Sequence, residues 1–420
     1  MNNLLSKSLE KLYGLSDLPL EILVRVSTFL SDKDILNLSI CSKYLSDIRY
    51  VVKFTSKIDL ERICTLTYAH SFANVIYDKY GINYLRLKED TAFSYLPKSL
   101  LHIEMDDDYN ESLPALPESL QYLVLSREFD KPLPKLPRSL LGLKLGLRYY
   151  RSLPQLPESL LELELGRNYD KPLPQLPKSL QTLKLGYYYN QPLPQLPETL
   201  EYLILGHQYW KPLPILPGSL LVLKLGYLYN EPILQLPESL LDLKLSCKYN
   251  QQLPQLPNTL RLLKIGYHYN QLLPHLPETL QFLKIGYYYD QPLPQLPTSL
   301  LYLKICGNIN HRLPRLPSSL THLILVNRCK TKLPLLPRSL TYLDLGYYDH
   351  FLPLLPSSLT HIRIYCYDTY FIRQFPIRLL DIQLNRYFFM PLIVSVGDIF
   401  IDQFMCVADL SMSFLERLMF

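Results

Sequence analysis

Residues 181–200 read QTLKLGYYYNQPLPQLPETL, and residues 201–220 repeat the same arrangement as EYLILGHQYWKPLPILPGSL. The proline that opens each Pro-x-Ser/Thr-Leu phrase recurs every twenty residues from Pro97 to Pro337. After the loss of one residue, the series continues to Pro376. A fixed period of this length is typical of a solenoid, in which each coil packs on its neighbours.

Each coil combines a strand pattern with a proline-rich return. In residues 137–156, PRSLLGLKLGLRYYRSLPQL, an L-x-x-L-x-L pattern is formed by Leu140, Leu143 and Leu145, whose side chains would face a core. Gly146 follows where the chain must turn with little side-chain bulk, and Gly or Ser fills this position in most coils. The Pro-Leu-Pro segment has a preset φ and few donors, which predicts an extended or polyproline-like return rather than a helix.

An aromatic residue occupies the same position in ten successive coils, and Asn or Asp commonly follows it. Asn and Asp tolerate the left-handed geometry of a turn. We interpret the aromatic column as a buried stack rather than as a ligand site. The aromatic positions are Tyr109, Phe129, Tyr149, Tyr169, Tyr189, Tyr209, Tyr229, Tyr249, Tyr269 and Tyr289.

Composition limits the class of protein. With 48% hydrophobic residues the 420-residue chain has enough apolar material for a core, and a net charge of +5 is too small to indicate a nucleic-acid partner. Seven scattered Cys without a CxxC pair favour reduced thiols over disulfides or a zinc site. No signal peptide is recognisable at the N-terminus, and the apolar run 388–407 carries Asp398 and Asp402, so we interpret it as buried protein rather than a membrane span.

The coil resembles the leucine-rich repeat and, more specifically, the FNIP repeat, which is named for a Phe-Asn-x-Pro phrase. The phrase stands as FDKP at 129–132, YNQP at 189–192 and YNEP at 229–232, and the coils around Ile309 and Cys329 depart from it. The resemblance implies a right-handed solenoid of short parallel β-strands. FNIP-repeat proteins are known chiefly from social amoebae and giant DNA viruses, where many carry an N-terminal F-box.

Residues 18–45, LPLEILVRVSTFLSDKDILNLSICSKYL, closely resemble the F-box, a small α-helical domain. Pro19 suits a first helical turn, and Ser31 and Asp32 supply capping groups between two helical runs. The F-box aromatic expected near the end is replaced by Leu45. The resemblance implies docking on a Skp-type adaptor of a cullin complex. The residues expected at this contact are Leu18, Pro19, Ile22, Leu23, Ile35, Leu38 and Lys43.

Residues that flank the core leucine of each strand would point outward, onto a concave face. A column of lysines on this face runs beside an apolar and aromatic strip. Like charges about 5 Å apart repel by about 0.8 kcal/mol in bulk water. Three interpretations of the lysine column remain. The lysines are solvated and have no function, or they bind an acidic segment of a target protein, or, less favoured, they bind nucleic acid. The candidate target-binding residues are Lys144, Lys184, Lys224, Lys244, Lys264, Lys284, Lys304, Tyr202, Phe282 and Tyr302.

A second column, one residue after each repeat proline, alternates in charge over the first coils. Opposite charges on adjacent coils would form ion pairs worth a few tenths of a kcal/mol each and favour correct stacking. We interpret this column as a device for coil alignment and not as a site. Its members are Lys98, Glu118, Arg138, Glu158, Lys178 and Glu198.

No motif of catalysis is present in the sequence. HExxH, GxGxxG, Walker and GxSxG patterns do not occur, and the acidic cluster Glu104 and Asp106–Asp108 is typical of a solvated end. We therefore expect no catalytic residue, no metal and no cofactor.

The expected domains are an N-terminal tail at 1–15, an F-box at 16–56, a connecting segment or N-terminal cap at 57–94, repeats at 95–384 and a C-terminal cap at 385–420. The hypothesis that follows is a non-enzymatic substrate receptor of a cullin-type ubiquitin ligase, located in the cytoplasm or nucleus (the host cytoplasm if viral). The alternatives are an interaction scaffold whose F-box-like helices only cap the array and, more weakly, a nucleic-acid-binding solenoid.

Overall fold

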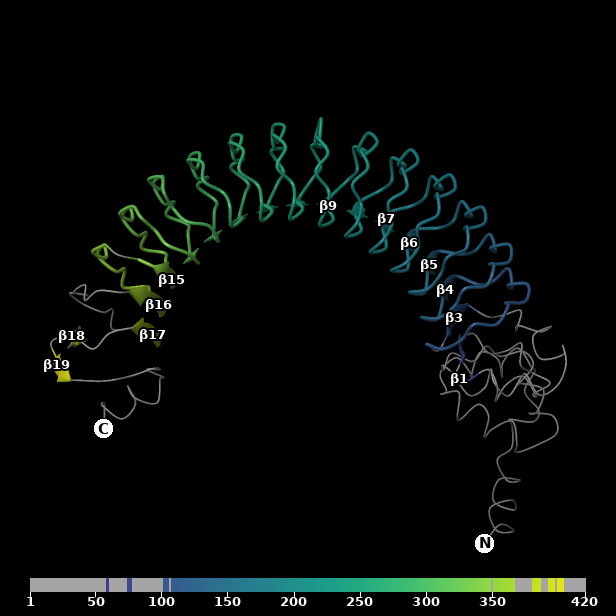
Figure 1. The fold of residues 1–420 in the computed structure, drawn as a ribbon, viewed down its shortest axis with the longest axis horizontal. Coiled ribbons are helices and arrows are strands. Elements are labelled where there is room, and N and C mark those ends of the chain that lie inside the picture. The colour runs from purple at the N-terminus through teal and green to yellow at the C-terminus, as the bar shows by residue number, and fades with distance from the viewer. Residues whose placement is uncertain are drawn as a thin grey trace, which may run out of the picture. The chain divides into compact units, whose positions relative to one another are not determined.

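The computed structural model describes residues 101–105, 107–348, 350–366 and 380–386, together with the strand segments 58–59, 74–77, 392–396 and 399–403. The predicted tail and F-box, residues 1–56, lie outside the described residues. The chain divides into two compact units, residues 1–187 and 188–420, and each is a stack of coils (Figure 1).

Unit 1 is a ladder of short parallel strands. Neighbouring strands pair one coil apart, so that Leu123 lies opposite Leu143 and Leu143 opposite Leu163. The strands are β1 (Ile58–Asp59), β2 (Asn74–Tyr77), β3 (His102–Met105), β4 (Tyr122–Val124), β5 (Gly142–Lys144), β6 (Glu162–Glu164) and β7 (Thr182–Lys184).

Unit 2 continues the same design from β8 to β17 and adds an antiparallel pair, β18–β19. The register shifts once, after Leu345 in the β15–β16 pair, where the coil is one residue shorter. The strands are β8 (Tyr202–Ile204), β9 (Val222–Lys224), β10 (Asp242–Lys244), β11 (Leu262–Lys264), β12 (Phe282–Ile285), β13 (Tyr302–Ile305), β14 (His322–Leu325), β15 (Tyr342–Tyr347), β16 (His361–Cys366), β17 (Asp381–Arg386), β18 (Leu392–Val396) and β19 (Ile399–Gln403).

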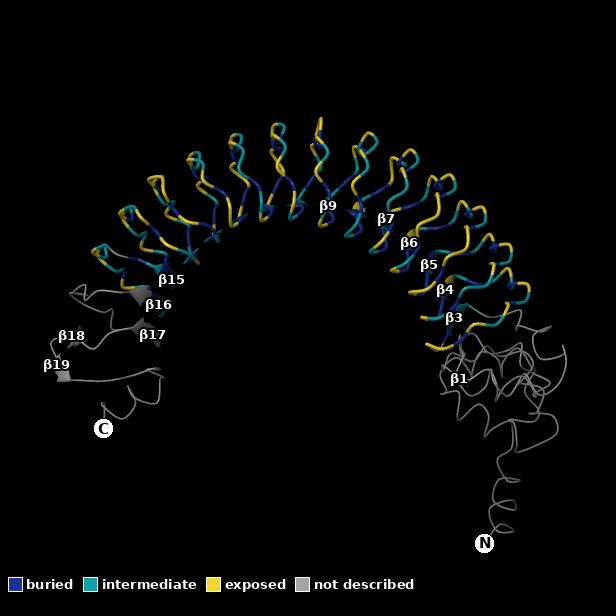
Figure 2. Cartoon of the chain, viewed as in Figure 1, coloured by how far each residue is buried: buried dark blue, intermediate teal, exposed yellow. Residues whose placement is uncertain are grey.

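The core of each coil is formed by the predicted leucines. Leu140, Leu143 and Leu145 are buried, and Leu153 and Leu156 of the return segment close the coil against them. Figure 2 shows the same alternation of buried and exposed residues in every described coil. The return segments contain turns but no helix in the described residues, so the predicted solenoid of coils about twenty residues long is confirmed.

The buried aromatic column, here called the tyrosine spine, is also confirmed. In unit 1 the rings of Tyr109, Phe129, Tyr149 and Tyr169 follow one another at 6.0–6.1 Å with nearly parallel planes. In unit 2 the rings from Tyr189 to Tyr289 stack at 6.2–6.3 Å. In the later coils Ile309, Cys329 and then Tyr348 fill the same buried position.

The spine helps to explain why each unit curves. Parallel strands lie about 4.8 Å apart, whereas the spine rings lie 6.0–6.3 Å apart. Each coil is therefore a wedge that is thinner at its strand. Within each unit the strands accordingly line the concave side, as the sequence predicts (Figure 1).

Serine and threonine of the Pro-x-Ser/Thr-Leu phrase join each coil to the one before it. In unit 1 the Ser159 hydroxyl donates to the carbonyl oxygen of Leu140 at 2.7 Å, and in unit 2 Ser239 donates to Leu220 at 2.7 Å. The phrase itself is a turn, because the Leu140 N–H donates to the Pro137 carbonyl oxygen at 3.2 Å. The repeated hydroxyl is thus a link between coils.

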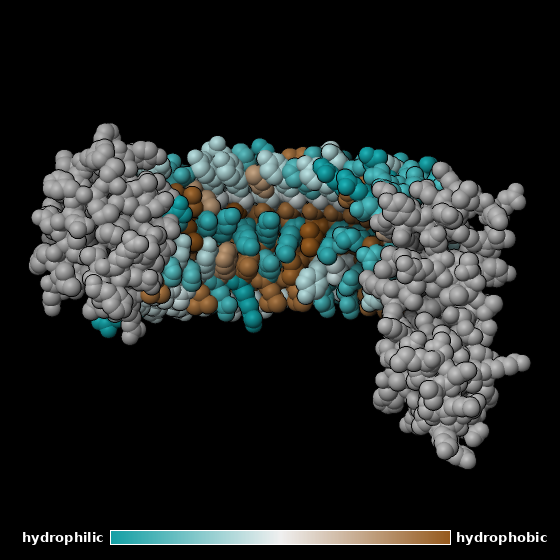
Figure 3. Space-filling model, turned by 90° about the horizontal axis from the view of Figure 1, so that it is seen from below, coloured by the Kyte–Doolittle hydropathy of each residue, from teal (hydrophilic) through white to brown (hydrophobic). Residues whose placement is uncertain are grey.

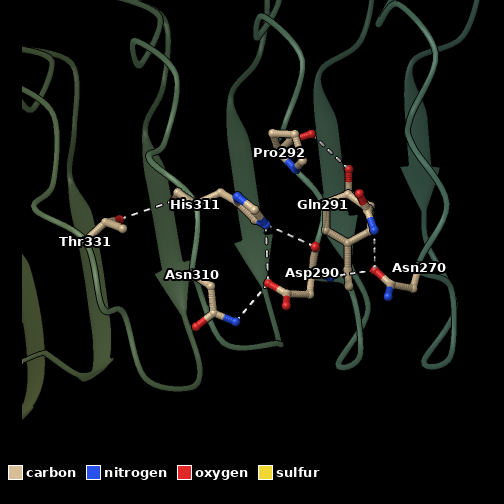
Figure 4. Close-up of polar contacts among 8 residues, drawn as sticks. Asn270, Asp290, Gln291, Pro292, Asn310, His311 and Thr331 are labelled. Atoms are coloured by element: carbon tan, nitrogen blue, oxygen red, sulfur yellow. Dashed lines mark hydrogen bonds and ion pairs between the residues drawn. The ribbon is translucent and has the colours of Figure 1, made fainter.

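The Asn or Asp position has a further role that differs from the turn chemistry predicted for it. Its side chain accepts a hydrogen bond from the backbone N–H one coil later: Asn230 accepts from Asn250 and Asn270 from Asp290, both at 2.8 Å. Figure 4 shows the end of this ladder, where the Asn310 side-chain amide donates to the carboxylate of Asp290 at 2.8 Å.

The charge-alternating column also acts differently from the prediction of ion pairs. Glu118 and Glu158 accept hydrogen bonds from the backbone N–H groups of Arg138 and Lys178 at 3.2 and 3.1 Å. Glu198 accepts in the same way from Gly218, which has no side-chain charge. The carboxylate binds the peptide N–H of the next coil, so a basic side chain is not required there. Lys98 lies outside the described residues.

The glycine after each strand permits close approach of two coils. A Cβ placed on Gly166 would lie 1.7 Å from the carbonyl oxygen of Gly146 in the preceding coil. Ser126 and Ser246 are accepted at this position, where their hydroxyl groups donate to the carbonyl oxygens of Tyr109 and Tyr229. From Ser126 to Gly286 this position holds only Gly or Ser, whereas Cys306 and Val326 occupy it in the later coils.

Substitution of Gly166 by valine is therefore expected to lower the free energy of unfolding by about 1–3 kcal/mol, because the new side chain forces two coils apart. Gly218→Val is the matched control, since nothing lies within 4 Å of a Cβ at Gly218, and its effect should stay within about 0.5 kcal/mol. Denaturant unfolding of the two variants followed by circular dichroism makes the comparison. Equal losses would contradict the close-approach argument.

The tyrosine spine predicts alkaline unfolding. Burial raises the pKa of the Tyr149, Tyr209 and Tyr289 hydroxyl groups to about 12, whereas an unfolded tyrosine ionises near about pH 10. The folded chain holds more protons between these values, so stability is complete below pH 10 and is lost as the pH rises towards 12. Tyrosinate absorbance should rise together with the loss of circular dichroism. Ionisation of the spine near pH 10 in a chain that remains folded would contradict this.

Candidate functional site: the strand face

The exposed side chains of the strands form two parallel columns on the concave side of each unit. The register of the strands aligns Lys244, Lys264 and Lys284 in a central column, and Asp242, Leu262 and Phe282 in a flanking column two residues earlier. Figure 3 shows hydrophilic and hydrophobic side chains side by side on this face. The central column contains Glu104, Val124, Lys144, Glu164 and Lys184 in unit 1, and Ile204, Lys224, Lys244, Lys264, Lys284, Lys304, Ile324, Asp344 and Arg363 in unit 2.

In unit 1 the two lysines of the central column share one carboxylate, which offsets half of their charge. Glu164 lies between them, with Lys144 Nζ at 3.0 Å from one carboxylate oxygen and Lys184 Nζ at 3.4 Å from the other. Burial by itself would raise the pKa of Glu164, but the hydrogen bond and charge of Lys144, with those of Lys184, lower it overall. These two predicted target-binding lysines are therefore already occupied by an internal partner.

In unit 2 the charge of the central column is not offset in this way. Within the described residues, none of the five lysines at 224, 244, 264, 284 and 304 lies within 4.0 Å of a carboxylate oxygen. Two carboxylates interact with these lysines at longer range. Burial raises the pKa of Asp242 against the opposing attraction of Lys224, Lys264 and Lys244, and burial raises the pKa of Asp344 against the attraction of Arg363 and Lys304. The five strands from β9 to β13 thus carry a continuous positive column.

Rings stack on one another in the flanking column of unit 2. Phe282 and Tyr302 lie face to face, with centroids 4.3 Å apart and an interplanar angle of 7°. Three further rings continue the stack at 5.6–5.8 Å, namely His322, Tyr342 and His361. Lys264 Nζ lies 5.3 Å from the centre of the Phe282 ring, which joins the two columns. Tyr202 is in the flanking column as predicted, but Val222, Asp242 and Leu262 separate it from this stack.

Two threonines hold the histidines of the stack. The Thr321 hydroxyl donates to the Leu301 carbonyl oxygen at 2.9 Å, and the same oxygen lies 2.9 Å from His322 Nδ1. Thr360 and His361 repeat this arrangement. Sequence reasoning missed these threonines and His361, although the recurring Thr-His pairs at 321–322 and 360–361 were a signal for them.

The family models place two features on this chain: F-box domain at residues 15–50 and FNIP repeat at residues 151–188 and 174–208. The chain carries an F-box domain and FNIP repeats. Both resemblances seen in the sequence are thereby confirmed. No similar sequence was found among the curated proteins.

Solved leucine-rich-repeat structures share the fold of this F-box and FNIP-repeat protein. The giant-virus protein CroV588, described as a circular leucine-rich-repeat structure, is 26% identical with a TM-score of 0.57. The match covers 76% of this chain, which spans 60% of the length of CroV588. YopM, a leucine-rich effector protein from Yersinia pestis, is 25% identical with a TM-score of 0.50, over 74% of this chain and 88% of YopM.

Other predictions remain open. The adaptor-binding residues Leu18, Pro19, Ile22, Leu23, Ile35, Leu38 and Lys43 lie outside the described residues, and their role stays a prediction. Within the part of the chain that is described, no group of three or more His, Cys, Asp or Glu side chains could hold a metal ion. In the same part, no helix has the length and hydropathy of a membrane span. The apolar run 388–407 contains the antiparallel strands β18 and β19.

A substitution of Glu164 tests whether its ion pairs with Lys144 and Lys184 stabilise unit 1. Because its pKa is lowered in the folded chain, the carboxylate stabilises the fold fully at pH values above its ordinary pKa of 4.5. This contribution is lost as the pH falls through the lowered pKa. Glu164→Gln should therefore lower the free energy of unfolding at neutral pH by at most about 1 kcal/mol and flatten its acid dependence. Glu162→Gln on the same strand is the control. Unfolding curves that depend on pH equally in both variants would contradict this role.

Proposed function

We propose that the protein is a substrate receptor of an SCF-type cullin ubiquitin ligase. The observation that carries the proposal is the presence, in one chain, of an F-box domain at 15–50 and a repeat solenoid. The F-box implies binding of a Skp-type adaptor, and the solenoid is suited to protein binding. The exposed strand face of the solenoid would then hold the target.

In this mechanism the chain contributes proximity and its partners contribute the chemistry. Holding a target beside the ligase raises the effective concentration of the target's lysines at the reacting centre. The matched families are typically non-catalytic, which agrees with a receptor that has no catalytic residue, cofactor or metal of its own. The place of action would be the cytoplasm or nucleus, including the host cytoplasm if the protein is viral.

The adaptor contact is proposed to be apolar, with Leu18, Pro19, Ile22, Leu23 and Ile35 as its centre. A helical unit of about forty residues has little core of its own, so it gains stability when a partner covers its apolar side. In the competing interpretation, the F-box-like helices only cap the solenoid and need no partner. The two interpretations differ in whether these side chains contact another protein.

A pull-down of a purified Skp-type adaptor by the full chain tests the proposal. Leu18→Ala/Pro19→Ala is expected to reduce adaptor capture about tenfold or more, because truncation of central apolar contacts dominates the loss of interface energy. Leu4→Ala/Leu5→Ala, in the predicted tail, is the matched control and should leave capture unchanged. Absent capture by the parent chain, or equal capture by all three proteins, would contradict the ligase function and favour the scaffold.

A further inference from the structure

The central column differs between the two units in the chemistry that it offers a partner. In unit 1 a single carboxylate, Glu164, binds two lysines, so an incoming anion would have to displace it. In unit 2 the lysines at 224, 244, 264, 284 and 304 lie in register on consecutive strands without a carboxylate at ion-pair distance in the described residues. Such a column is electrostatically unfavourable alone and becomes favourable when an anionic partner lies along it.

The ring stack beside these lysines narrows the class of partner. Nucleobases bind aromatic side chains by stacking on an open ring face. In unit 2 the faces of Phe282 and Tyr302 cover each other at 4.3 Å, and His322 and Tyr342 continue the stack. Inside the stack the rings therefore offer mainly their edges, and the edge of an aromatic ring carries the positive part of its quadrupole.

Ammonium groups, ring edges and tyrosine O–H groups attract the same kind of ligand, namely carboxylates and carbonyl oxygens. We propose that the strand face of unit 2 binds an extended acidic segment of a partner protein. Its carboxylates contact the lysines of β9–β13, and its adjoining apolar residues contact the ring stack from Phe282 to His361. This inference rests on the proposed function only in taking the strand face as the target-binding surface.

The geometry fits such a segment. Alternate side chains of an extended chain project to one side about every 6.8 Å, and the four-carbon stem of a lysine is flexible enough to follow that spacing. Strands β12 and β13 each carry both a lysine and a ring: Lys284 with Phe282, and Lys304 with Tyr302. A segment that contains both acidic and apolar residues therefore matches this part of the face better than a uniformly acidic one.

The test measures binding of a fluorescent synthetic peptide with alternating Glu and Leu residues to the purified full chain. Lys244→Gln/Lys264→Gln/Lys284→Gln is expected to weaken binding about tenfold or more. Lys144→Gln/Lys184→Gln should change it less than about twofold, since both lysines are already paired with Glu164 and lie outside the proposed site. Lys135→Gln/Lys171→Gln/Lys332→Gln controls for net charge at exposed sites away from the strands.

Three results would overturn the inference: no binding by the parent chain at low salt, equal loss in all lysine variants, or tighter binding of a single-stranded oligothymidine than of the peptide. The last result would identify a nucleic-acid face. No adaptor takes part in this assay, so its outcome is independent of the adaptor pull-down. Peptide binding without adaptor capture would contradict the ligase function and support the acidic-segment site. Adaptor capture without peptide binding would support the ligase function and contradict the acidic-segment site.

Discussion

The structure depends on the parallel hydrogen-bonded ladder that joins each coil to the next. Because one coil is about twenty residues long, every residue lies beside the residue of the same position in the neighbouring coil, as Leu243 does beside Leu263. Any group that bonds to the adjacent coil can therefore be repeated along the stack of each unit. The serine hydroxyls, the asparagine amides and the glutamate carboxylates all follow this rule, and each bonds to a backbone group of the adjacent coil that lies outside the strands.

The same constraint leaves the outward strand positions free to vary. A core leucine or a spine ring is held by packing, but a residue in the central column is partly exposed and mainly faces its neighbours on the strand face. The chain has used this freedom differently in its two units. In unit 1 the charge alternates along the column, and Glu164 pairs with Lys144 and Lys184. In unit 2 five consecutive strands each carry a lysine at this position. A charge pattern that has only a small effect on folding thereby becomes a property available for recognition.

Much of this design could be predicted from the order of residues. The twenty-residue period, the strand leucines and the burial of the aromatic column follow from sequence because they repeat, and repetition reveals which positions share one environment. For Asn230 and Glu198 the sequence predicts turn conformation and ion pairs instead of the hydrogen bonds that they form. Their hydrogen bonds run to the backbone of the next coil, and the identity of a side chain does not tell which backbone group will lie opposite it.

The sequence by itself determined the solenoid, its core and the two columns of its strand face, since each depends on spacing along the chain. Only the tertiary structure decided which lysines pair with a carboxylate, which rings stack and how the histidines are held. Lys144 and Lys244 occupy equivalent positions in the repeat, yet only the first reaches a carboxylate, because the neighbouring strand presents Glu164 to it and lysines surround the second. Charge and stacking are properties of pairs across coils, and the pairs exist only after the strands have aligned.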